Sequence, residues 1–310
     1  MASIISGDHA QTQGVAPAAD ILSIRVTNEN GSSDSFTLAE AIIQAVDGGA
    51  EVINISMGSS VDSRIVSNAV NYAIEQGSVI IASAGNEGVS GLAFPAGNEG
   101  VISVGAIEAS GEHVDFSNTS NQLDIVAPGF QVNAAWEEDK LIPFSGTSAS
   151  APYVSGAIAA VMSLEPGISA TDAAERVVSL SNDAGSPGAD SEYGIGVLAI
   201  DRVLEFGTSG IFDAAITGQV IDPSSNNQIL VTVQNQGTET LINSPVTITG
   251  ALDTEEHNIS SLNPGEIHTF EVSTGSFISG DTISITSTIG TFETDIDPDN
   301  NNRSNTFAAE

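Results

Sequence analysis

The stretch SGTSASAPYVSG at residues 145–156 places a serine, Ser148, between a Gly-Thr turn and a run of small and apolar residues. The run predicts a helix that begins beside Ser148 and holds the hydroxyl at a fixed position. A serine hydroxyl attacks a carbonyl carbon when a neighbouring base takes its proton. The same residues also fit an ordinary N-cap, because Ser and Thr side chains accept from the free N–H groups of a helix start.

Two further stretches carry polar groups suited to the same chemistry. In ASAGNEG (82–88), Asn86 has an amide that can donate hydrogen bonds, and a helix start at Ser148 would leave its backbone N–H free to donate as well. In VINISMG (52–58), a short apolar run is followed by the polar and flexible residues 56–58. Each stretch has a plainer interpretation, since asparagine and glycine favour turns and Ser56-Met57-Gly58 can simply end a strand.

The elements that must position these residues alternate between β-rich runs and helical stretches. The β-rich runs are 19–27, 51–56, 78–86, 100–108 and 123–129. The helical stretches are 36–49, 63–77 and a run from about 148, and residues 1–6 are typical of the last turns of a helix that stops at Gly7. Apolar strands separated by helices of this length predict an α/β domain with a parallel sheet covered on both faces.

The character of the chain changes after residue 206. Residues 211–310 alternate with period two, contain Gly, Asn and Pro turns, and have no helical stretch. Short strands at regular spacing predict a β-sandwich of about 100 residues. The predicted domains are 1–208 and 209–310.

Taken in order, the motifs of residues 1–206 resemble those of the subtilisin-like serine proteases. SGTSASAPYVSG matches the serine motif G-T-S-x-A-x-P-x-V-x-G, and GVAPAADILSIRV, VINISMG, ASAGNEG and LDIVAPG follow the order of the family. The resemblance implies a subtilisin-like fold, with Ser148 as nucleophile and Asn86 in the oxyanion hole. It also implies peptide-bond hydrolysis through an acyl-enzyme, on a protein or peptide substrate. By the same resemblance, substrate binds at Ser56, Met57, Gly58, Ser83, Ala84 and Gly85.

Two members of the family triad have no counterpart in this chain. MASIISG matches the continuation of the family's histidine helix, so the resemblance places the histidine about four residues before Met1 and the aspartate earlier still. His9, His113, His257 and His268 are expected on the surface. We therefore expect an N-terminally truncated protease, inactive as it stands. The alternative is a catalytically dead extracellular module that binds a peptide or a glycan.

The amino-acid composition limits which kinds of molecule the protein is expected to bind. The chain has 310 residues, with 40 Asp and Glu against 6 Lys and Arg, a formal net charge of −34 and no cysteine. Such a charge repels nucleic acid and anionic membranes and suits salty surroundings, where counterions screen self-repulsion. No apolar run reaches the roughly 18 residues of a membrane span. The resemblance implies secretion to the extracellular space, although the chain carries no signal peptide.

The second domain resembles the CARDB-type, immunoglobulin-like modules of surface and secreted proteins. The resemblance rests on ILVTVQNQGTET (229–240), SLNPGEIHTFEV (261–272) and DIDPDNNNRSNT (295–306), and it implies binding of a surface partner. The acidic DIDPDNNN run offers oxygen ligands of the kind that Ca²⁺ takes, but a solvated turn is the favoured interpretation. Pro95 matches a family proline that is often cis, and an ordinary loop proline is equally consistent with the sequence.

Overall fold

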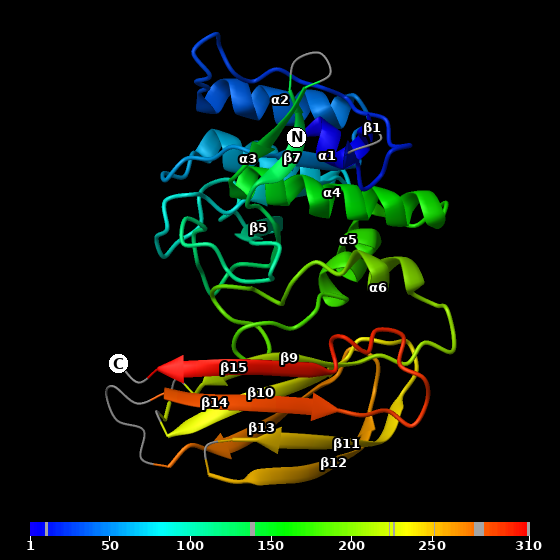
Figure 1. The fold of residues 1–310 in the computed structure, drawn as a ribbon. Helices are drawn as coiled ribbons and strands as arrows, with labels where there is room; N and C mark the ends of the chain where they lie inside the picture. The colour runs from blue at the N-terminus through cyan, green and yellow to red at the C-terminus, as the bar shows by residue number, and fades with distance from the viewer. Residues whose placement is uncertain are drawn as a thin grey trace. The chain divides into compact units, whose positions relative to one another are not determined.

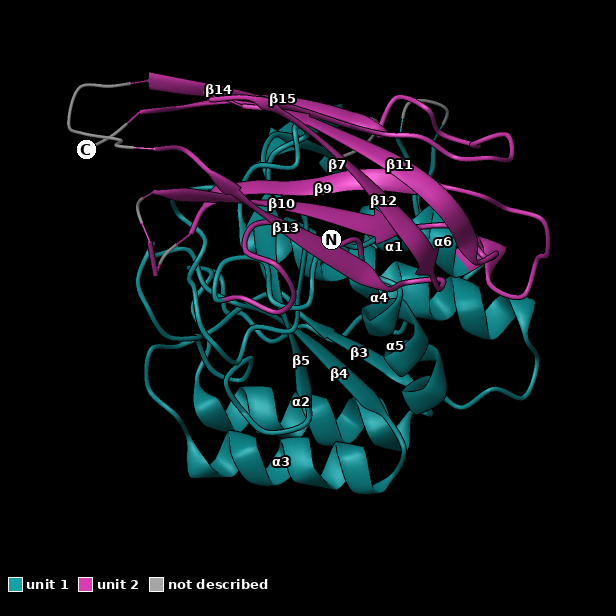
Figure 2. Cartoon of the chain, turned by 90° about the horizontal axis from the view of Figure 1, so that it is seen from below, with its two compact units in different colours: residues 1–181, 191–203 teal, residues 182–190, 204–310 magenta. Residues whose placement is uncertain are grey.

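The computed structural model describes residues 1–9, 12–136, 140–222, 224–225, 227–250, 252–275 and 282–308. The chain divides into two compact units (Figure 2), of which unit 1 is Met1–Ser181 with Ser191–Val203 and unit 2 is Asn182–Asp190 with Leu204–Glu310. Residues 182–190 therefore group with the second unit, although they lie inside the predicted range 1–208. None of the helices in the described ranges is long and apolar enough to cross a membrane.

Unit 1 is built on a four-stranded parallel sheet with the order β3-β4-β5-β6, of which β5 is labelled in Figure 1. Its strands are β3 (Val52–Ile55), β4 (Val79–Ser83), β5 (Val101–Ile107) and β6 (Ile125–Pro128). Two hairpins accompany it, β1 (Asp8–His9) with β2 (Thr12–Gln13) and β7 (Val132–Trp136) with β8 (Lys140–Phe144). The helices are α1 (Ala2–Ser6), α2 (Ser35–Asp47), α3 (Arg64–Glu75), α4 (Thr147–Leu164), α5 (Ala170–Ser179) and α6 (Ile200–Glu205).

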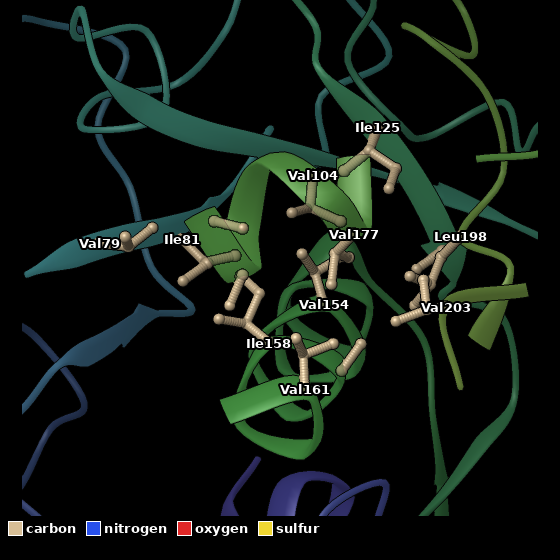
Figure 3. Close-up of a cluster of buried hydrophobic side chains, with 14 of the residues drawn as sticks. Val79, Ile81, Val104, Ile125, Val154, Ile158, Val161, Val177, Leu198 and Val203 are labelled. Atoms are coloured by element: carbon tan, nitrogen blue, oxygen red, sulfur yellow. The ribbon is translucent and has the colours of Figure 1, made fainter. Parts of the chain in front are cut away.

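Helices cover both faces of the sheet, with α2 and α3 on one side and α4 and α5 on the other (Figure 2). Successive residues of β4 serve the two sides, because side chains alternate along a strand. Ile80 packs with Ile42 of α2, whereas Ile81 packs with Ile158 of α4 and Val177 of α5 (Figure 3). The apolar run of β4 is therefore buried on both faces, which confirms the predicted doubly covered α/β sheet.

The strand predicted at 19–27 is wrong. This segment forms no strand and pairs with no described neighbour. Ile21 and Leu22 remain 42% and 53% exposed. The β-branched composition favours an extended backbone, but a strand also needs a partner to complete its hydrogen-bond ladder. Composition alone says nothing about whether that partner is present.

Unit 2 is a β-sandwich of two antiparallel sheets, which confirms the prediction. The sheets have the orders β13-β10-β9 and β12-β11-β14-β15. Their strands are β9 (Ala214–Ile221), β10 (Gln228–Asn235), β11 (Leu241–Thr249), β12 (Thr254–Leu262), β13 (Ile267–Ser273), β14 (Thr282–Ile289) and β15 (Asn302–Ala308). The core lies between the sheets, where Val231 and Val233 of β10 pack in one cluster with Ile283 and Ile285 of β14.

A buried carboxyl group attaches the 182–190 segment to the sandwich. Asp183 is 5% exposed, its backbone N–H donates to Gln234, and its carboxylate accepts from Gly188 N at 2.7 Å and Thr217 Oγ1 at 3.3 Å. Burial, with a smaller contribution from the charge of Asp190, raises the pKa of Asp183 to about 6, although both hydrogen bonds oppose that shift. The charged form of Asp183 is thus disfavoured in the folded protein.

We expect Asp183→Asn to stabilise the sandwich above pH 7 and to have little effect near pH 4. Because the folded pKa lies above its ordinary value of 3.8, the contribution of Asp183 to stability is fully present below pH 4 and is lost as pH rises through about 6. The full loss is at most about 3 kcal/mol, from 1.36 kcal/mol per pKa unit. Urea unfolding of the full chain at pH 4.5 and pH 8 measures it. Asp253→Asn, at an exposed aspartate of the same unit, is the control, and equal pH dependence of the two variants would contradict the prediction.

Candidate active site

Ser148 lies in the first turn of α4, half-buried, as the second helical residue. The sequence predicts a helix beginning just after Ser148, and the structure begins it one residue earlier, at Thr147. The N-cap is Gly146 at φ +149°, a backbone conformation that L side chains rarely adopt. The small residues Ala149, Ser150 and Ala151 are fully buried, so this end of the helix lies close against its neighbours.

A reciprocal pair of hydrogen bonds joins Ser148 to the end of β3. The Ser148 hydroxyl donates to the carbonyl oxygen of Ser56 at 3.0 Å. In return, the Ser56 hydroxyl donates to the carbonyl oxygen of Ser148 at 2.9 Å. Two residues that are 92 positions apart in the chain are thereby held side by side, as the resemblance implies for a nucleophile and a substrate-pairing segment.

The orientation of the Asn86 amide follows from its partner. Asn86 Oδ1 accepts from the backbone N–H of Thr147 at 2.7 Å and from Thr147 Oγ1 at 3.0 Å. Because a backbone N–H only donates, the atom facing it is the amide oxygen, and the NH₂ group points away. Among the described residues, neither Asn86 Nδ2 nor Ser148 N has a hydrogen-bond acceptor. The site thus offers two N–H donors without a protein acceptor, on residues that the Asn86–Thr147 contact brings together.

Asn118, which no sequence motif singles out, holds this loop in place. It is 3% exposed, and its Oδ1 accepts from the backbone N–H groups of Glu87 at 3.1 Å and Val89 at 3.2 Å. Its Nδ2 donates to the carbonyl of Ala84 at 3.3 Å and to the Glu87 carboxylate at 3.0 Å. That carboxylate also accepts from the backbone N–H of Asn86 at 3.0 Å. An asparagine in FSNTS has no sequence signal that separates it from a turn residue.

A glycine makes room for Asn118. Gly85 has φ +115°, and a Cβ built on it would lie 2.2 Å from Asn118 Nδ2. Both the backbone conformation and the close approach therefore require glycine just before Asn86.

The other residues assigned to substrate binding lie around the same point. Ser83 and Ala84 are buried at the end of β4, Met57 is half-buried, and Gly58 is exposed. The chain after Gly58 pairs with residue 94 in an antiparallel bridge, Ser59 N to Phe94 O at 2.9 Å and Phe94 N to Ser59 O at 2.8 Å. The Phe94–Pro95 peptide bond is cis.

No imidazole among the described residues hydrogen-bonds to Ser148. His9 is exposed in β1, and His257 and His268 belong to unit 2, where both rings contact Phe270. His9 and His268 are exposed as expected, but His113 and His257 are half-buried, and the ring edge of His113 lies against Tyr193 at a centroid distance of 6.1 Å. Tyr193 and His113 are 80 positions apart in the chain, so the residues next to His113 could not predict this contact.

In the described part of the chain, no group of three or more His, Asp or Glu side chains is arranged to hold a metal ion. In the acidic turn of unit 2, Asp295 Oδ2 accepts from Ala214 N at 3.0 Å and Asn301 Nδ2 at 3.2 Å. Asp295 Oδ1 accepts from Asp297 N at 3.0 Å. Both oxygens of Asp295 therefore bind donors of the protein itself, as in a self-capped turn, and the Ca²⁺ site stays a prediction.

Comparison with known proteins gives one family match. The model of the subtilase family (Peptidase_S8) matches residues 1–196. The chain is 33% identical over 192 residues to the thermostable alkaline protease of Halalkalibacterium halodurans, an alignment covering 62% of this chain and 52% of that protein. It is 26% identical over 250 residues to the minor extracellular protease Epr of Bacillus subtilis, covering 78% of this chain and 39% of the relative. The chain thus spans about half or less of the length of these curated relatives.

A solved structure is similar in fold. The patellamide maturation protease PatA aligns with a TM-score of 0.61 at 29% identity, over 66% of this chain and 81% of that one.

Proposed function

This chain belongs to the subtilase family, and from that premise we propose that it is part of a serine endopeptidase that cleaves peptide bonds through an acyl-enzyme on Ser148. The observation that carries the proposal is the pair of N–H donors of Asn86 and Ser148, which have no acceptor among the described residues; one belongs to Ser148 itself, and the other to the residue that accepts from its neighbour Thr147. Donors of this kind stabilise the oxyanion of acyl transfer.

The proposed reaction follows from these groups. A base takes the hydroxyl proton of Ser148, and Oγ attacks the carbonyl carbon of the scissile bond. The negative oxygen receives hydrogen bonds from Asn86 Nδ2 and Ser148 N. The base then passes its proton to the leaving amine, and water hydrolyses the ester by the same route. The Ser56 carbonyl, which accepts the Ser148 hydroxyl in this structure, is released for the backbone of the substrate.

We assign the base and its orienting acid to a segment that precedes Met1 in the complete protein, as the family motif order implies. The sheet supports this assignment. β3 is at the end of the sheet, and no described strand pairs with its outer edge. The apolar segment 19–27 also lacks a ladder partner, although its Ile24 packs in one cluster with Ile53 of β3. An added strand on β3 would complete the sheet and bring further catalytic groups to its end.

The two parts of the chain have separate tasks in this proposal. Residues 1–208 are the peptidase domain. Residues 209–310 are a CARDB-type, immunoglobulin-like module that binds a surface partner, and the resemblance in their turn motifs supports this. We place the protein outside the cell, which the match to a minor extracellular protease supports. A formal net charge of −34 makes nucleic acid a poor partner, because the two would repel each other.

A fluorophosphonate probe tests the proposal, because its phosphorus is attacked only by an activated serine. Two proteins are compared: the chain as printed and the extended protein, which we define as this chain with the in-frame residues encoded before Met1. We expect the extended protein to be labelled at Ser148 and the printed chain to stay unlabelled. A stop codon directly upstream, or an unlabelled extended protein, would favour the binding module for peptides or glycans. Labelling of the printed chain would show that a base within residues 1–310 activates Ser148, and it would refute the assignment of the base to a segment before Met1.

A further inference from the structure

A proline interrupts the hydrogen bonding of the helix that carries Ser148. Pro152 lies inside α4, four residues after Ser148. In an α-helix the N–H of a residue donates to the carbonyl four residues earlier, but proline has no N–H and its ring pushes that carbonyl aside. The carbonyl of Ser148 therefore lacks its usual donor four residues later, and a partner from elsewhere can take that place.

The Ser56 hydroxyl supplies that partner. It donates to the Ser148 carbonyl at 2.9 Å, from the end of β3 to the first turn of α4. The hydroxyl has its own donor, because Asn54 Nδ2 donates to Ser56 Oγ at 2.9 Å. A hydroxyl that accepts from an amide keeps its single proton for another acceptor, so the bond to Ser148 has a defined direction.

The amide of Asn54 is oriented in turn by α4. Ser155 Oγ lies 3.1 Å from both Asn54 Oδ1 and the carbonyl oxygen of Ala151, so its one proton is shared between these two acceptors. The chain of donors therefore runs from Ser155 to Asn54, from Asn54 to Ser56 and from Ser56 to Ser148, beginning and ending on the same helix. It fastens the first two turns of α4 to β3 at two points.

We infer that the Ser56 hydroxyl is a positioning residue for the nucleophile, and that it replaces the helical hydrogen bond that Pro152 cannot make. This role differs from the substrate pairing assigned to the Ser56 backbone, because it belongs to the side chain. The hydrogen bond from the Ser56 hydroxyl to the Ser148 carbonyl, which we call the bridge, is a property of the fold. Its value for catalysis rests on the proposed function, since a shift of about 1 Å at a nucleophile is enough to slow attack about 10²-fold.

The bridge is tested in the printed chain by a double-mutant cycle of Ser56→Ala and Pro152→Ala, read by urea unfolding. Ser56→Ala leaves a carbonyl without a donor and should raise the equilibrium constant of unfolding about tenfold. Pro152→Ala restores an N–H four residues after Ser148, so it should recover most of that loss. The recovery in the Ser56→Ala background must exceed the effect of Pro152→Ala alone. Strict additivity of the two changes would overturn the inference.

Positioning is tested in the extended protein by the rate of fluorophosphonate labelling. Ser56→Ala should lower the rate of the bond-forming step at least tenfold with little change in reversible binding, and Ser56→Thr, which keeps a hydroxyl, should restore it. Ser150→Ala is the matched control, because its buried hydroxyl on the same helix has no hydrogen-bond partner among the described residues. If the cycle shows coupling but Ser56→Ala labels at the wild-type rate, the bridge is only structural and the positioning role is refuted. An unlabelled wild-type extended protein refutes the proposed function, and the cycle still decides the bridge.

Discussion

Ser148→Ala in the extended protein will lower kcat for peptide hydrolysis about 10⁶-fold and abolish labelling by the fluorophosphonate probe. The size of the loss follows from the role of the hydroxyl, because without it neither the base nor the oxyanion donors can act on a covalent intermediate; loss of a serine nucleophile elsewhere has this magnitude. Hydrolysis of a chromogenic peptide under single-turnover conditions measures the effect.

Ser150→Ala is the control for this experiment. Ser150 lies in the same motif, its hydroxyl is fully buried, and it has no hydrogen-bond partner among the residues that the structure describes. Removing an unpaired buried hydroxyl costs little stability, so this variant should keep nearly all of the activity. A large loss for Ser150→Ala together with a small one for Ser148→Ala would contradict the assignment of the nucleophile.

Asn86→Asp and Asn86→Leu will each lower kcat about 10²–10³-fold or more, with little change in KM, since the loss of one oxyanion donor has that effect. The two variants distinguish two functions of the Asn86 side chain, donation to the oxyanion and acceptance from Thr147 N. Aspartate keeps an oxygen for Thr147 N, which lies 2.7 Å from Oδ1 in this structure, but it donates nothing and adds a negative charge beside the oxyanion. Leucine removes both the donor and the anchor. The kinetics of the extended protein with a series of peptide substrates measure both.

Asn28 provides the matched control for these variants. Its Oδ1 also accepts from backbone N–H groups, those of Asn30 at 2.9 Å and Ser32 at 3.1 Å. Asn28→Leu therefore removes comparable hydrogen bonds from a loop that contributes no group to the proposed reaction. If Asn28→Leu and Asn86→Leu reduce kcat equally, the effect at Asn86 reflects stability and not donation to the oxyanion.

Features that depend on residues close together in the chain could be predicted from the sequence. The run SVIIAS predicts a strand buried on both faces, and β4 is buried along its whole length. The resemblance of SGTSASAPYVSG, ASAGNEG and VINISMG to the motifs of a known family implies one site for Ser148, Asn86 and Ser56. In the structure Ser56 hydrogen-bonds to Ser148, and Asn86 hydrogen-bonds to the adjacent Thr147. Period-two alternation likewise predicted the sandwich of unit 2. Each of these signals is carried by residues that are neighbours in the chain.

Only the tertiary structure decided which distant side chains support the site. Asn118 and Glu87 are 31 positions apart, and Ser56 and Ser148 are 92 apart; no local pattern relates such residues. Segment 19–27 has the composition of a strand but no ladder partner, and Asp183 is buried through contacts with a sandwich that begins about 30 residues later. The sequence by itself determined the types of element and the identity of the reactive groups, because propensity and periodicity are local. Hydrogen-bond partners, burial and pairing depend on the folded path of the whole chain, and these set how Ser148 and Asn86 are held.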